Sequence, residues 1–154
     1  MNTYKPGSDN NVVIYDYASN HFEGQWPEGL SHTQAYVHTG LYLSWVVMEN
    51  LLSEEFLNSH VREIELLRQR KVTGPKLFES IDGKFTSTML NQKGNDFTAY
   101  YFDLEKGSYM HDYEFALARY VENPYCVEDS WENFDKIALS IQQRYRAWLD
   151  VDIN

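Results

Sequence analysis

Residues 31–52 read SHTQAYVHTGLYLSWVVMENLL, and this segment decides the fold of the chain. A turn at Pro27 precedes it, and Ser31 is a residue type that caps the start of helices. From Ala35 to Leu52 the segment is apolar almost all round, rather than along one stripe. A helix of this kind is enclosed by other elements. We therefore predict a central helix over residues 31–52.

The rest of the chain predicts helices that can surround this one. A continuous apolar stripe with steps of 3, 4, 3, 4 and 3 predicts a helix over 129–149, through Trp131, Phe134, Ala138, Ile141, Tyr145 and Trp148. Caps and breaks predict further helices over 53–70, 75–81, 91–104 and 108–120. Only 12–15, and weakly 85–88, look like strands. We predict an all-α single compact domain of about six helices, with at most a marginal β element near the N-terminus.

Length and composition favour one soluble domain over residues 1–154, with residues 1–11 flexible. No apolar stretch approaches the ~18 residues that a membrane span needs, and the first residues are polar. We therefore expect a cytoplasmic protein that does not enter the membrane. Cys126 is the only cysteine, which excludes an internal disulfide and a site of four cysteine ligands for zinc.

Charge is concentrated in one part of the chain. The net charge is −10, and residues 95–135 carry ten acidic and two basic side chains, a net charge of −8. Nucleic acid is disfavoured as a direct ligand, because binding to phosphates requires Lys and Arg. A basic protein partner suits this segment better, since complementary fields speed association and select partners. Solubility alone explains the same charge.

Tyrosines are interleaved with these acidic residues. Tyrosine offers a large contact area with few rotatable bonds and is enriched in protein interfaces. We expect most of the tyrosines to face inward and the rest to contact a partner. The predicted partner-binding residues are Asp103, Glu105, Tyr109, Asp112, Tyr113, Glu114, Glu122, Glu128 and Asp129.

Catalytic motifs are absent from the sequence. There is no GxSxG, HExxH, Walker-type loop, GxGxxG or EF-hand loop. The best remaining constellation is Asp16, His21 and His38, which converge if the N-terminal segment folds back over the central helix. Two imidazoles and a carboxylate suffice for a divalent metal ion. A buried histidine held by hydrogen bonds explains the same residues equally well, so no cofactor or metal is predicted.

Several short motifs together resemble a known family. They are Asp16-x-Ala18-x-x-His21, Trp26-Pro27, Ala35-x-x-His38-x-Gly40 with Trp45, and Gly94-Asn95-x-Phe97 with Tyr100-Tyr101. The series resembles a family of small bacterial proteins that has no established reaction. It departs from the family at Asn20, where Trp is usual. The resemblance implies a bacterial origin, and small acidic bacterial proteins of this kind often look like immunity proteins.

Three functions are compatible with these observations. The first is a non-enzymatic immunity (antitoxin-like) protein that neutralises a cognate cationic toxin, such as a nuclease, through the acidic, tyrosine-rich surface. The second is a metal-dependent hydrolase that uses Asp16, His21 and His38. The third is an adaptor that binds another cellular protein, as a monomer or a homodimer. The first is our leading prediction.

Overall fold

Helices dominate the described part of the chain, which is residues 11–153 of a computed structural model. In this range there are eight α-helices and one two-stranded antiparallel sheet. The prediction of a mostly helical domain with a marginal β element near the N-terminus is therefore confirmed. The predicted flexibility of residues 1–11 concerns a segment that lies, except for residue 11, outside the described residues.

The central helix is α2, Val37–Met48, and a 3-10 turn, η2, His32–Tyr36, leads into it. Ser31 caps this turn, because its side chain accepts a hydrogen bond from the backbone N–H of Thr33. The α-helix ends sooner than predicted, because Asn50 adopts a left-handed conformation with φ 61°. Of the residues in α2, all but Met48 are buried, which confirms that this helix is enclosed.

The remaining helices follow the predicted segments with two clear differences. The predicted helix over 53–70 is broken at His60, whose φ of −134° is not helical. The short helix α1, Ser19–Phe22, was not predicted. The other helices are α3, Glu54–Ser59, α4, Val61–Arg68, α5, Gly74–Ser80, α6, Gln92–Tyr101, α7, Tyr109–Leu117, and α8, Trp131–Ile153, with 3-10 turns η3, Ser87–Met89, and η4, Pro124–Cys126.

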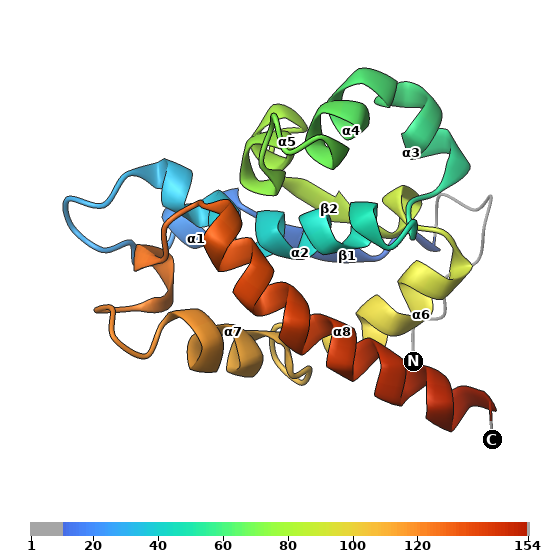
Figure 1. The fold of residues 1–154 in the computed structure, drawn as a ribbon. Helices are drawn as coiled ribbons and strands as arrows, with labels where there is room; N and C mark the ends of the chain where they lie inside the picture. Colours follow the sequence, from blue (N-terminus) through green and yellow to red (C-terminus); the bar gives the residue numbers. More distant parts are fainter. Residues whose placement is uncertain (1–10, 154) are drawn as a thin grey trace.

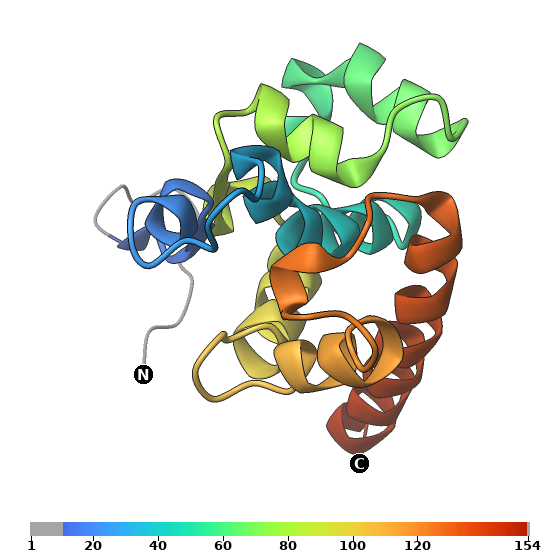
Figure 2. The ribbon, with the colours of Figure 1, turned by 90° about the vertical axis from the view of Figure 1, so that its left-hand side faces the viewer.

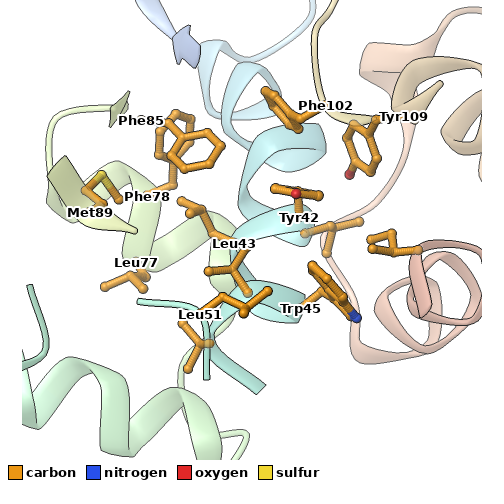
Figure 3. Packing of buried hydrophobic residues seen from close by; sticks show 14 of the residues in the cluster. Tyr42, Leu43, Trp45, Leu51, Leu77, Phe78, Phe85, Met89, Phe102 and Tyr109 are labelled. Carbon is orange, nitrogen blue, oxygen red and sulfur yellow. The ribbon is translucent and has the colours of Figure 1, made fainter. Parts of the chain in front are cut away.

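Two groups of helices enclose α2. Figures 1 and 2 show α3, α4 and α5 on one side of α2, and α6, α7 and α8 on the other. Figure 3 shows aromatic side chains gathered around α2, with Tyr42 between Phe85, Phe102 and Tyr109. The hydroxyl of Tyr42 is satisfied in this core by Thr98, at 2.9 Å. The core is thus rich in aromatic side chains, and the buried Tyr42 hydroxyl has a hydrogen-bond partner.

Helices α2 and α5 touch through glycines. A Cβ atom on Gly40 would lie 2.3 Å from the Cα of Pro75, and one on Gly74 would lie 2.0 Å from the carbonyl oxygen of Gly40. No side chain fits between backbones this close. Pro75 at the start of α5 is also suited to its place, since the first turn of a helix does not need its N–H.

The small sheet anchors the N-terminal segment. Strand β1, Ile14–Tyr17, pairs with β2, Lys84–Thr86, and Asp16 lies opposite Phe85. Beyond the strand, the backbone N–H of Ala18 donates to the carbonyl of Gly83, at 2.8 Å. Asp16 is the buried residue of this strand. The sheet therefore holds one carboxylate against the interior beside α2.

Membrane insertion finds no support among the helices of residues 11–153. None of them combines the length with the apolar character that crossing a bilayer requires.

Candidate functional site

Asp16, His21 and His38 come together in the structure as the sequence suggested. They belong to three separate elements, β1, α1 and α2. The side-chain ligand atoms of the three residues all lie within 4.8 Å of one another. The two imidazole rings meet edge to face, with their centroids 4.7 Å apart. Residues far apart in sequence thus form one compact polar cluster.

Two further side chains complete the cluster. His21 Nε2 lies 2.7 Å from Asp16 Oδ1, and the hydroxyl of Thr39 donates to Asp16 Oδ2 at 2.6 Å. The other imidazole nitrogen of His21, Nδ1, lies 2.8 Å from the hydroxyl of Tyr125. His38 Nε2 lies 3.6 Å from Asp16 Oδ2, which is beyond hydrogen-bond distance. A chain of hydrogen bonds therefore runs from Thr39 through Asp16 and His21 to Tyr125, with His38 beside it.

The charge states in the cluster follow from burial and pairing. Burial alone would raise the pKa of Asp16, but the hydrogen bond from His21, the positive charges available on His38 and His21, and the hydrogen bond from Thr39 together lower it. Burial lowers the pKa of His38 to about 4, although the charge of Asp16 opposes this shift. At neutral pH the site therefore contains a carboxylate and a neutral His38 imidazole.

A pocket of about 320 Å³ opens beside the cluster. The side chain of His21 is 17% exposed, whereas those of Asp16 and His38 are 3% exposed, so solvent meets the cluster mainly at His21. Glu114 of α7 faces the same pocket. The rest of the pocket wall is formed by Leu104, Met110, Pro124 and Tyr125.

Thr39 and Tyr125 belong to the cluster but were not predicted to. Thr39 is a fully buried polar residue in a helix of mostly apolar residues. Its polar side chain among apolar neighbours was the sequence feature that could have indicated a buried hydrogen bond. Tyr125 meets His21 across 104 positions of sequence, and nothing local indicates that contact. It lies in η4, which Gln34 tethers by donating to the carbonyls of Tyr125 and Val127.

The predicted tyrosine anchors are wrong. Tyr109 and Tyr113 are fully buried, so neither can contact a partner. They lie one turn apart on the face of α7 that packs inward, and Tyr109 donates a hydrogen bond to the backbone carbonyl of His38. The hydroxyl of Tyr113 is buried without a partner among the described residues. Both tyrosines are part of the core that supports the cluster.

Two of the predicted acidic contacts are tied into the fold. The carboxylate of Asp112 binds Arg144 of α8 through two hydrogen bonds of 2.9 Å and accepts another from Tyr101. Hydrogen bonding to Arg144 and Tyr101 outweighs burial and lowers the pKa of Asp112. Asp129 is half-buried and accepts from Thr73. The exposed members of the predicted set are Asp103, Glu105, Glu114, Glu122 and Glu128.

An exposed patch lies at the end of α7 and in the loop that follows. We call it the α7 patch; it consists of Glu114, Phe115, Tyr120, Val121 and Glu122. Phe115 is 61% exposed and Tyr120 is 92% exposed. Beside Phe115 the surface is hollowed by about 410 Å³, and Glu114 and Glu122 both line this hollow.

Arg119 is the cation at this surface. Its guanidinium lies 4.4 Å from the ring centroid of Phe115 and 5.6 Å from that of Tyr120. Such contacts attract a cation to the face of an aromatic ring. The aromatic side chains of the α7 patch can therefore interact with positive charge.

Comparison with known proteins identifies the family. The family described as Domain of unknown function (DUF7832) matches residues 14–127, and the chain belongs to it. The matched range contains the Asp16–His21–His38 cluster, Tyr125 and the α7 patch. No curated protein and no solved structure matches the chain. The prediction of a family without an established reaction is thus confirmed.

Proposed function

We propose that this DUF7832 protein is a bacterial immunity protein of the cytoplasm, which binds a cognate cationic toxin domain through the α7 patch and blocks it. The observation that carries the proposal is the exposure of Phe115 and Tyr120, with Glu114 and Glu122 lining the hollow that Phe115 also lines. Large exposed apolar side chains grouped on one surface are typical of sites that bind another protein. This surface is the best supported partner site among the described residues.

Apolar contact supplies the affinity in this proposal. Aromatic residues are enriched among those that dominate binding energy, because they bury a large area at a small cost in side-chain entropy. Tyr120 and Phe115 are the aromatic anchors of this proposal, in place of the predicted anchors Tyr109 and Tyr113. Val121, which is 37% exposed, extends the apolar surface beside them.

In this proposal, the acidic side chains select the partner and speed its association. Glu114 and Glu122 outnumber the one arginine, Arg119, that lines the same hollow, and Asp103, Glu105 and Glu128 are exposed on neighbouring segments of the chain. An acidic surface accelerates encounter with a basic partner and repels acidic ones. A toxin that acts on nucleic acid has a cationic groove for phosphates, and carboxylates can occupy such a groove.

The test is co-expression with the protein encoded by the adjacent gene. We expect a complex that survives gel filtration and protects the host from growth arrest by that protein. Tyr120→Ala should weaken the complex by at least about tenfold, since it removes an exposed aromatic anchor. Glu122→Lys should slow association and reduce its dependence on salt.

Glu65→Lys is the matched control. It makes the same charge change at an exposed position of α4, on the opposite side of α2 from α7 (Figure 1). We expect it to leave binding unchanged. If no complex forms, or if Glu65→Lys weakens it as much as Glu122→Lys, the proposal is wrong. A complex without growth protection would instead indicate the adaptor function.

A further inference from the structure

We propose that Asp16, His21 and His38 form a binding site for one divalent first-row transition-metal ion. This goes beyond the proposed function and does not depend on the α7 patch. The three side chains bring two imidazoles and one carboxylate to one point from three elements of the fold. That set of donors suits ions such as Zn²⁺, which binds imidazole and carboxylate ligands in proteins.

The spacing of the donor atoms fits a single ion after a small adjustment. Metal–ligand bonds of about 2.0–2.2 Å place neighbouring donor atoms roughly 3–3.5 Å apart. The observed separations are 2.7 Å from Asp16 Oδ1 to His21 Nε2 and 3.6 Å from Asp16 Oδ2 to His38 Nε2, and the ligand atoms of the three residues all lie within 4.8 Å of one another. Binding one ion therefore requires the three side chains to draw together, with shifts of about 1 Å that bring the donor distances to the values of a metal site.

The residues behind the donors are arranged as in a metal site. Metal-binding imidazoles and carboxylates are usually oriented by hydrogen bonds on their other atoms. Tyr125 lies at hydrogen-bond distance from His21 Nδ1, which leaves Nε2 on the side of Asp16. Thr39 orients the carboxylate of Asp16 in the same way. Both supporting contacts stay compatible with a bound ion, provided that Nδ1 of His21 carries the proton.

His38 takes no part in the hydrogen-bond chain that joins Thr39, Asp16, His21 and Tyr125. The Asp16 carboxylate is already satisfied by His21 and Thr39, and His38 Nε2 lies outside hydrogen-bond distance of it. The imidazole of His38 instead lines the pocket beside the cluster, where a metal ion or water can reach it. A metal ion gives His38 a partner and uses every donor in the cluster.

Access and open coordination positions are also available. The pocket of about 320 Å³ reaches both histidines, and Glu114 faces it. With three protein ligands, an ion would keep at least one position open toward this pocket for water, Glu114 or a small ligand. An ion with an open position is what the hydrolase prediction requires, since such an ion lowers the pKa of bound water.

The experiment measures metal binding by the full chain without a polyhistidine tag. After treatment with a chelator and its removal, Zn²⁺ is titrated by calorimetry and Co²⁺ by visible absorption. We expect one equivalent of Zn²⁺, and Co²⁺ bands typical of nitrogen and oxygen ligands. Asp16→Asn and His21→Gln should abolish binding, and Tyr125→Phe should weaken it by about tenfold.

His111→Gln is the matched control, because His111 is an exposed histidine of α7 outside the cluster. It should bind Zn²⁺ like the unaltered protein. Circular dichroism of each metal-free variant establishes that it is folded. Where a variant does not fold, X-ray absorption of the Co²⁺-loaded unaltered protein identifies the ligands instead. Absence of a stoichiometric site, binding that Asp16→Asn leaves intact, or an absorption spectrum without imidazole ligands would overturn the proposal.

Discussion

Replacing Gly40 with Ala should push α2 and α5 apart. The new Cβ atom would lie 2.3 Å from Pro75 Cα and 2.4 Å from Pro75 N. Non-bonded carbon atoms pack at about 3.5–4.0 Å, so the clash is roughly 1 Å or more. The atoms that it meets belong to the backbone, and a rotamer change cannot move them away. The two helices must therefore separate at the centre of the molecule.

Two effects set the size of the loss in stability. Alanine is favoured over glycine within a helix by about 1 kcal/mol, which helps the variant. Overpacking a tight interior costs about 1–3 kcal/mol, and the upper end applies where backbone meets backbone. We therefore expect the free energy of unfolding to fall by about 2 kcal/mol, a large part of the ~5–15 kcal/mol that holds a domain together.

Urea unfolding followed by circular dichroism measures this change. Gly24→Ala is the matched control, since a Cβ atom there meets its nearest neighbour at 3.6 Å, an ordinary contact. It should be neutral or stabilise the protein by up to about 1 kcal/mol, because it restricts the unfolded chain. If Gly40→Ala proves as stable as the unaltered protein, the close approach of α2 and α5 is not a constraint and the reasoning is refuted.

Two further predictions concern ionisable side chains. His38 is neutral when folded, with a pKa of about 4, against 6.5 when unfolded, so only the unfolded chain gains its proton as the pH falls from 6.5 to 4. This difference in proton binding should reduce the free energy of unfolding by about 2 kcal/mol at pH 5, compared with neutral pH. A folded His38→Gln variant should therefore lose less stability in urea as the pH falls. If its pH profile equals that of the unaltered protein, His38 is not a buried neutral imidazole. Asp112→Asn should destabilise the protein by about 1–2 kcal/mol, because it weakens the paired bonds to Arg144 and the bond from Tyr101. In thermal unfolding, a loss no larger than that of Glu122→Gln, which removes an exposed carboxylate outside this network, would show that Asp112 is not structural.

Local sequence patterns, the spacing of apolar residues and the capping residues, predicted most of the helices. The apolar stripe of α8 is buried at Phe134, Ile141 and Tyr145, at the predicted spacing. Capping residues also predicted the starts of helices, since the Ser53 side chain accepts a hydrogen bond from the backbone N–H of Phe56 at the start of α3. Such signals act within one or two turns of the chain and need no tertiary context. The break at His60 has no comparable signal, and we find no local cause for it.

The candidate sites were predicted unevenly for the same reason. Asp16, His21 and His38 were grouped correctly, because polar residues in an apolar segment need partners once it is buried. The predicted partner surface stays a prediction, and the structure bears only on the exposure of its residues. In the same acidic segment, Tyr109 and Tyr113 are buried whereas Phe115 and Tyr120 are exposed.

The sequence by itself determined the helical class, an enclosed central helix and the concentration of acidic charge, since each is a property of composition or of periodicity over a few turns. Only the tertiary structure decided which side chains are free and which are paired. Arg144 reaches Asp112 across 32 positions, and Tyr125 reaches His21 across 104. Contacts at these separations depend on how α7, α8 and η4 pack around α2, and packing geometry is set by the whole core rather than by any one segment.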